Sequence, residues 1–486
     1  MKITVLPLDS RPCNHSWVKK FAKLSNVNLA IVPEKDSGNL KQGLDFLKYE
    51  EWLLEESLRS DYLLVSIDGL VSGGLIQARK AEMEETEAFR RLALLAKIKE
   101  QNPSIKILAF DTIMRTSIST TDNATRVYWE KMNRFSRLKG KLYFDYSIET
   151  EKALEQLTHE IPEEIINTYL LARSKKHQVN LKLCELVKEG IIDQLLLLQE
   201  DSMNQGMQQI ESVKLMNYVK NNDLEEQILL YNGTDEATVV LLGRALLKAK
   251  GEKPKVHVLL SDELVKNKIM PFEDRELEIN YQNMMNFIGL ESVSYSEADY
   301  VLALYSEADN VYDLDLESTK EIKPKIDQKF SSFIEKVNQA IEGKKWVEFV
   351  DLLYPNGGSF KVLEPVNYQK LLGYSAWNTS SNSLGSALAT IAIHAYSKGD
   401  LSSFLYERII DDCFYQTYAR REANVSLLDS EVNIYNMNTE EEKEALKLIN
   451  IGLKKVVQQT LQVNYKISLP WSRTFEIDID VEENNA

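Results

Sequence analysis

Two adjacent carboxylates, Asp235 and Glu236, are the residues of this chain whose type and spacing best suit acid–base chemistry. They end the segment Tyr231-Asn-Gly-Thr-Asp-Glu236, directly after a short apolar run that predicts a β-strand. Neighbouring side chains of a strand point to opposite faces, so consecutive carboxylates share a site only where the strand ends and the chain bends, as Gly233 permits. In a low-dielectric cleft their repulsion would raise the pKa of one of them, leaving one proton donor and one carboxylate, as glycoside hydrolysis requires.

The same residues also have a structural interpretation. Thr234 or Asp235 could cap a helix over Ala237–Lys250, and Glu236 would then interact favourably with the positive N-terminus of that helix. Both interpretations stay open at the level of the sequence.

Polar residues follow most of the other predicted strands, and active sites of parallel α/β folds form at the carboxyl ends of strands. Arginine is not a capping residue, yet three arginines follow strands at short range, which suits recognition of an oxygen-rich small molecule, with structural ion pairing as the alternative. A tryptophan in a polar loop could stack on a sugar ring or anchor the loop. The predicted substrate-binding residues are Asp9, Arg11, Asp68, Arg79, Asp111, Arg115, Asp201, Asp351, Asn356, Trp377 and Asn378.

The elements that must position these residues are short apolar runs that alternate with longer amphipathic ones. Helical spacing over Glu84–Gln101 and Ala237–Lys250 between such runs indicates βαβ units and a mainly parallel sheet, hence an α/β fold. The predicted strands are Ile3–Leu8, Asn28–Val32, Tyr62–Ile67, Ile105–Phe110, Gln194–Gln199, Gln227–Tyr231, Val256–Leu260, Tyr300–Leu304, Val347–Val350 and Leu371–Tyr374. They outnumber the strands of a closed barrel, so the fold is either TIM-barrel-like with some false strands or consists of two α/β domains.

Three parts are predicted along the chain. Residues 1–250 form an α/β barrel-like part that carries the Asp-Glu pair, residues 251–395 add α/β units that complete the site, and residues 396–486 are mostly helical. Within the last part, Glu440–Gln458 is a long amphipathic run, and Thr439 followed by Glu442 predicts a capping box at its start.

Composition narrows the function. A net charge of −16 disfavours nucleic acid as a partner. The three cysteines, Cys13, Cys184 and Cys413, are far apart, which argues against a disulfide framework or a structural zinc site. The first apolar run is broken by Pro7 and Asp9 and no run is long enough to span a membrane, so we expect a cytoplasmic protein without a membrane partner. Neither a P-loop, a dinucleotide fingerprint, a GxSxG elbow nor a paired-histidine motif occurs, so neither an organic cofactor nor a histidine-rich metal site is expected, whereas a divalent ion bound by carboxylates stays open.

Several motifs together resemble a bacterial family known only as a domain of unknown function. The resemblance runs from the N-terminus to about Gly385 and implies no activity. The motifs that carry it are PLDSRPCN, DGLVSGGLIQAR, FDTIMR, GTDE, YPNGGS and SAWNTSSNSLG.

A second, local resemblance does imply chemistry. Leu8-Asp-Ser-Arg11 is similar to the strand-one Asp-x-x-Arg of family 20 β-N-acetylhexosaminidases, with one residue fewer, and Gly233-Thr-Asp-Glu236 is similar to their Gly-Gly-Asp-Glu. Here the pair follows the sixth predicted strand instead of the fourth. The likeness implies that Arg11 holds sugar hydroxyls and that Asp235 orients a 2-acetamido group. It also implies that Glu236 acts as general acid and then base, with Trp377 stacking on the ring.

The sequence therefore predicts a glycoside hydrolase that acts on an amino sugar or related glycoside, with a small carbohydrate as its binding partner. One alternative is a metal-assisted hydrolase of a small phosphate or carboxylate ester. A second alternative is a sugar-binding protein without catalytic activity.

Overall fold

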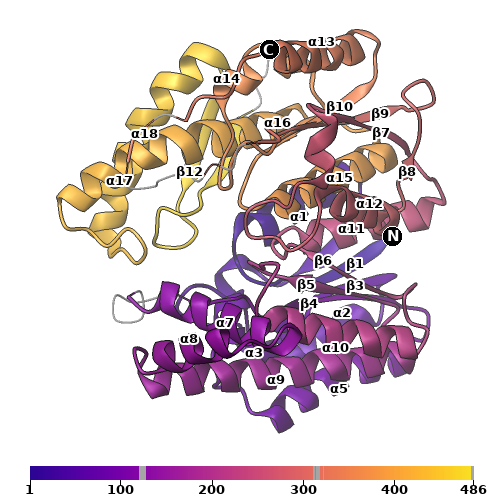
Figure 1. Ribbon diagram of the computed structural model, residues 1–486. Helices are drawn as coiled ribbons and strands as arrows, with labels where there is room; N and C mark the ends of the chain where they lie inside the picture. The colour runs from indigo at the N-terminus through magenta and orange to yellow at the C-terminus, as the bar shows by residue number, and fades with distance from the viewer. Residues whose placement is uncertain (120–126, 310–311, 313–317, 321, 483–486) are drawn as a thin grey trace. The chain divides into compact units, whose positions relative to one another are not determined.

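The computed structural model describes residues 1–119, 127–309, 312, 318–320 and 322–482. The chain divides into two compact units, each built around its own parallel sheet (Figure 1). The first unit comprises Met1–Leu241 and Phe272–Asp274, and the second comprises Leu242–Pro271 and Arg275–Ala486. The predicted α/β class is confirmed, in its two-domain form.

The first unit contains a six-stranded sheet in the order β2-β1-β3-β4-β5-β6, in which every pairing is parallel. Its inner strands are almost completely buried, as in a sheet covered on both faces. The strands are β1 (Lys2–Leu6), β2 (Asn28–Ile31), β3 (Tyr62–Ser66), β4 (Lys106–Ile113), β5 (Gln194–Gln199) and β6 (Ile228–Asn232).

Helices cover this sheet on both faces. Apolar residues of α2, α5, α9 and α10 form one core with the strands, and α1 lies on the opposite face (Figure 1). The helices are α1 (Ser16–Leu24), α2 (Phe46–Ser57), α3 (Ile67–Ser72), α4 (Leu75–Ala78), α5 (Glu85–Gln101), α7 (Trp129–Phe144), α8 (Ile148–Thr158), α9 (Glu163–Lys188) and α10 (Met207–Asn221). Helix α11 (Ala237–Lys250) begins in the first unit and ends in the second.

The second unit contains a five-stranded parallel sheet in the order β11-β10-β9-β7-β8. If β7 is counted as the first strand and the sheet is read from β8, this is the doubly wound order 2-1-3-4-5. The first sheet has the same order with a sixth strand, β6, added at its end. Ligands of such sheets bind where the strand order reverses, which here means between β1 and β3 and between β7 and β9. The strands are β7 (Lys255–Leu260), β8 (Glu291–Ser292), β9 (Tyr300–Tyr305), β10 (Trp346–Asp351) and β11 (Gly373–Ser375).

The rest of the second unit is mostly helical. Helix α13 and the elements after α15 share one apolar core with a face of the sheet, so residues 396–482 pack onto the sheet of the second unit. The elements are α12 (Leu277–Ile288), α13 (Gln328–Glu342), α14 (Phe360–Leu363), α15 (Ser380–Ser397), α16 (Ser402–Arg408), a π-helix (Ile409–Ala419), α17 (Arg420–Asp429), α18 (Thr439–Thr460) and the antiparallel pair β12 (Asn464–Ser468) and β13 (Asp478–Glu482). Short 3-10 turns cover Pro12–Asn14, Glu34–Asp36, Glu263–Asn267 and Tyr368–Lys370.

Two sequence predictions need correction. The closed barrel is not formed, because all ten predicted strands exist and divide between two open sheets. The capping box of α18 uses Asn438 and Glu441 instead of Thr439 and Glu442. Asn438 adopts an extended backbone and accepts two helix N–H groups, whereas Thr439 is already the first helical residue.

Candidate functional site

The loop after β1 and the turn after β6 meet through a buried arginine. Arg11 places its Nε and Nη2 groups 2.7–3.1 Å from the Asp9 carboxylate, and its Nη1 and Nη2 groups 2.9 and 2.7 Å from the Asp235 carboxylate. The side chains of all three residues are at most 7% exposed. Burial alone would lower the pKa of Arg11, but the carboxylates of Asp235 and Asp9 raise it well above its ordinary value. The guanidinium therefore remains charged and fixes two carboxylates in place.

Asn14 extends this contact toward the start of α11. Its Nδ2 donates to Asp9 Oδ1 at 3.1 Å, and its Oδ1 accepts from Thr238 Oγ1 at 3.2 Å. Strands β1 and β6 are not neighbours in the sheet, so it is the loops that bring Arg11 and Asp235 together.

Glu236 is completely buried beside this contact. Its Oε2 accepts the Thr234 N–H at 2.9 Å, and its Oε1 has no hydrogen-bond partner among the described residues. Burial, and to a smaller extent the nearby charge of Asp235, raise the pKa of Glu236 to about 8. The carboxyl group therefore keeps its proton at neutral pH. Acid catalysis by a carboxyl pair requires one member that carries its proton at neutral pH, and Glu236 meets this requirement.

Gly233 makes this turn possible. Its φ of 129° lies where side-chain-bearing residues are strained, and a Cβ atom at this position would lie 2.2 Å from Glu236 Oε1. The glycine thus gives the Glu236 carboxyl group the space into which it folds back.

The other two predicted arginines also pair with carboxylates at strand ends. Arg79 follows α4 and forms an ion pair with Glu200, and Arg115 follows β4 and forms one with Asp201. Burial first, and then the positive charge of Arg115, lower the pKa of Arg79 to about 9, while Arg11 adds further repulsion. The three arginines are therefore electrostatic neighbours within the first unit, and each has its own carboxylate.

A third cluster joins Asp68 and Asp111 through a residue that the sequence did not reveal. Lys176 Nζ contacts both carboxylates. Thr112 Oγ1 donates to Asp68 at 2.6 Å, and Asn180 Nδ2 donates to Asp111 at 2.7 Å. Burial raises the pKa of Asp111 to about 8 despite the opposing effect of Lys176, and Asp68 adds to the increase.

Lys176 and Asn180 were missed because they lie inside a helix. They continue a buried stripe of α9 that includes Tyr169 and Arg173 at helical spacing. The signal available in the sequence was a stripe at helical spacing in which polar residues interrupt an otherwise apolar helix face.

The four remaining predicted residues belong to the second unit. Asp351 is the last residue of β10, and its carboxylate accepts the N–H groups of Leu353 and Ser359 at 3.0 and 2.8 Å. Burial raises the pKa of Asp351 to about 7. Its carboxylate holds the backbone of the loop that follows β10.

The loops after β10 and β11 are joined to each other. Asn356 N–H donates to the Asn378 carbonyl at 2.7 Å, and the Trp377 indole Nε1 donates to Ser386 Oγ at 2.9 Å. Asp412 of the π-helix, which was not predicted, accepts the Ala376 N–H at 2.8 Å. The half-buried Trp377 is therefore anchored to the helix that follows it, the second of the two roles considered for it.

The residues that the structure describes contain no group of three or more His, Cys, Asp or Glu side chains placed to hold a metal ion. None of the helices in the described ranges is both long enough and apolar enough to cross a membrane.

Comparison with known proteins identifies the family of the chain. It identifies no relative whose role is known. A family model described as "Protein of unknown function (DUF4127)" matches residues 3–480. The chain belongs to this family, as its motifs indicated. No curated protein and no solved structure matches the chain.

Proposed function

We propose that this protein hydrolyses a glycoside of an amino sugar or a related sugar by carboxylate acid–base catalysis. The observation that carries the proposal is the state of Glu236. It is a buried carboxyl group with a pKa of about 8, next to a carboxylate that Arg11 fixes with two hydrogen bonds. A group with such a pKa is a suitable general acid near neutral pH.

The charge balance of the surrounding residues favours a neutral, hydroxyl-rich ligand. Each of Arg11, Arg79 and Arg115 is offset by at least one carboxylate, so the cluster has no excess positive charge to attract a phosphate. Carboxylates and guanidinium groups together supply the acceptors and donors that sugar hydroxyls use.

In the proposed mechanism Glu236 gives its proton to the glycosidic oxygen while the acetamido oxygen of the substrate attacks the anomeric carbon. The alcohol leaves as the bond between this carbon and the glycosidic oxygen breaks. Asp235 orients the acetamido group. The Glu236 carboxylate then takes a proton from the water that attacks the anomeric carbon, and the bond between this carbon and the acetamido oxygen breaks, which restores the acetamido group and leaves the free sugar and a protonated Glu236. Because Glu236 is fully buried, the turn at Gly233 must move to admit the glycosidic oxygen.

The test is hydrolysis of chromogenic glycosides, including the N-acetylglucosaminide and the N-acetylgalactosaminide, by the purified protein with and without EDTA. Glu236→Gln is expected to keep the fold and to lose at least about a hundredfold in kcat. Glu348→Gln is the matched control, because Glu348 is also a buried glutamate whose pKa burial raises, and it lies on β10 of the second unit. This variant is expected to keep full activity.

Each outcome decides between classes of function. EDTA-resistant release from an N-acetylated sugar that depends on Glu236 supports the acetamido-assisted mechanism. Release from other sugars alone would keep the acid catalyst and remove the acetamido role from Asp235. Full activity of Glu236→Gln would refute the assignment. Activity lost with EDTA would favour the metal-assisted hydrolase, and binding of a sugar without turnover would favour a binding protein.

The remaining properties that we propose follow from composition. The net charge of −16 is unfavourable for nucleic acid as a partner, and we propose a small carbohydrate as the partner and the cytoplasm as the location. The mechanism uses side chains of this chain alone and requires no cofactor.

A further inference from the structure

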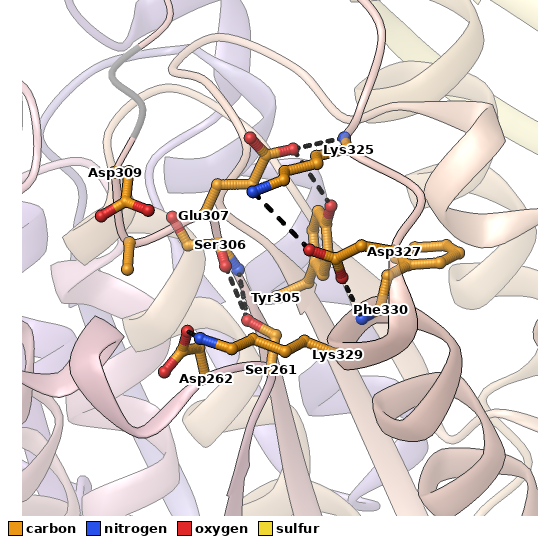
Figure 2. A pocket seen from close by; sticks show the side chains of 11 residues that line it. Ser261, Asp262, Tyr305, Ser306, Glu307, Asp309, Lys325, Asp327, Lys329 and Phe330 are labelled. Atoms are coloured by element: carbon orange, nitrogen blue, oxygen red, sulfur yellow. Dashed lines mark hydrogen bonds and ion pairs between the residues drawn. The ribbon is translucent and has the colours of Figure 1, made fainter.

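A pocket lies at the point where the strand order of the second sheet reverses (Figure 2). Ser261 follows β7 and Ser306 follows β9, and the two are joined at the strand ends. Ser261 Oγ donates to the Ser306 carbonyl at 2.7 Å and accepts the Ser306 N–H at 3.0 Å. The cavity measures about 90 Å³, which leaves room for more than one water-sized group. This is the crevice in which open α/β sheets bind their ligands.

Carboxylates dominate the walls of this pocket. Asp262, Glu307, Asp309 and Asp327 line it, against two lysines, Lys325 and Lys329 (Figure 2). Lys268 Nζ also lies against the pocket, since it donates to Ser306 Oγ at 3.2 Å and to the Glu307 carbonyl at 2.7 Å. Four acidic side chains against these three lysines leave the pocket negative, in a chain that is itself strongly acidic. A phosphate or carboxylate ligand is therefore disfavoured, and a cation is attracted.

Both lysines that line the pocket already place ammonium groups against these walls. Lys329 Nζ forms an ion pair with Asp262, and Lys325 Nζ lies 3.7 Å from Asp327 Oδ2. The lysine side chains are 65% and 64% exposed, respectively. Ion pairs this exposed contribute little to stability, so another ammonium group can replace either lysine without disturbing the fold.

We propose that this pocket binds a small molecule with a primary ammonium group, such as an unacetylated amino sugar or a short aliphatic diamine. The ligand ammonium takes the place of Lys329 on Asp262 and also faces Asp309. Its remaining polar groups reach Ser261 and Ser306 at the strand ends. This site belongs to the second unit and does not rest on the proposed hydrolase activity.

The test is isothermal titration of the full chain with glucosamine and putrescine, against N-acetylglucosamine and glucose as neutral controls. Both amines are expected to bind, and both neutral sugars to bind at least about tenfold more weakly, because the wall charges contribute only to the amines. Affinity for the amines is expected to fall as salt is added. A clear preference between glucosamine and putrescine would identify whether the natural ligand is an amino sugar or a diamine.

Variants test whether amine binding depends on the charges of the pocket, apart from any change in the fold. Asp262→Asn removes the charge but keeps a residue that caps the 3-10 turn as well as aspartate does, and it should weaken amine binding about fivefold. Asp309→Asn, at an exposed position, provides a second variant should the first fold poorly. Lys329→Ala should strengthen amine binding up to about fivefold by removing the competing ammonium group. Lys336→Ala, an exposed lysine of the same helix outside the pocket, should change nothing.

Three results would overturn the proposal. They are absence of amine binding, equal binding of glucosamine and N-acetylglucosamine, and weaker amine binding by Lys329→Ala. The Glu236→Gln variant should bind amines with unchanged affinity, so a failure of the hydrolase proposal would be distinguishable from a failure of this one.

Discussion

The protonation of Glu236 predicts an unusual dependence of stability on pH. In the folded chain its pKa is about 8, whereas its ordinary value of 4.5 applies to the unfolded chain. The folded chain therefore holds a proton that the unfolded chain releases at neutral pH. The resulting stabilisation is complete below the unfolded pKa and is lost as pH rises through the folded pKa. Raising the pH from 6 to 8 should thus lower the free energy of unfolding through Glu236.

The magnitude follows from one proton per molecule. Each pH unit within this window changes the free energy of unfolding by about 1.4 kcal/mol, and the change tapers as pH approaches the folded pKa. Between pH 6 and pH 8 the loss that belongs to Glu236 is about 2 kcal/mol. Glutamine has nearly the same shape and does not ionise, so Glu236→Gln should lack this part of the decline while every other titrating group contributes equally to both proteins.

The assay is urea unfolding at pH 6, 7 and 8, followed by circular dichroism and fitted with separate steps for the two units. The difference between wild type and Glu236→Gln should appear in the step of the first unit. Glu335→Gln, which alters an exposed glutamate of α13, is the control and should give a curve parallel to wild type. If the wild-type and Glu236→Gln curves are also parallel, Glu236 is ionised at neutral pH. Its assignment as general acid would then fail.

Three further predictions concern single positions, each measured by urea unfolding. Gly233→Ala should destabilise the first unit by about 3 kcal/mol through backbone strain and the contact with the Glu236 carboxyl group. Adding Glu236→Ala should recover part of this loss. If no stability is recovered, the strain lies in the backbone alone. Lys176→Met should cost about 3–5 kcal/mol because two buried carboxyl groups lose their cation, and a loss below about 1 kcal/mol would show that both are already neutral. Asn438→Ala should cost about 1 kcal/mol and Thr439→Ala less than half of that; the reverse order would place the capping box of α18 one residue later.

Much of the fold could be predicted because a parallel strand buried on both faces is a nearly continuous apolar run. Gln194–Gln199 and Tyr300–Tyr305 are such runs, and each lies within a residue of its prediction. Strand β8 was not predicted because it has only two residues, both exposed. The division into two sheets was one of the two predicted alternatives, and the sequence could not decide between them, since pairing between strands depends on contacts distant in sequence. The two sheets repeat one strand order without an evident repeat in sequence.

The site was predictable in part for the same reason. Arg11 and Asp235 were expected at strand ends, and the structure places them in direct contact. The sequence could not say that loops would bridge strands that are not neighbours in the sheet. The signal for Lys176 was only its place in a stripe of α9 at helical spacing, because the lysine itself is indistinguishable from a solvent-exposed one until its buried partners are known.

The raised pKa values of buried carboxyl groups are a further argument for function at the strand ends. Three carboxyl groups whose pKa burial raises lie near the end of a strand or just after it, namely Asp111 in β4, Glu236 after β6 and Asp351 at the end of β10. Others lie elsewhere, such as Glu211 in α10 and Asp412 in the π-helix. By contrast, the partly exposed Glu87 has its pKa lowered to about 2, chiefly by its hydrogen bonds to Arg90 and Arg91. A buried ionisable group costs free energy that an apolar side chain of similar size would not. A fold that keeps such groups at the carboxyl ends of its strands gives up stability at the place where α/β proteins carry out chemistry. The difference between wild type and Glu236→Gln in how stability depends on pH measures this cost in free energy. The activity lost in the same variant measures the contribution of Glu236 to catalysis.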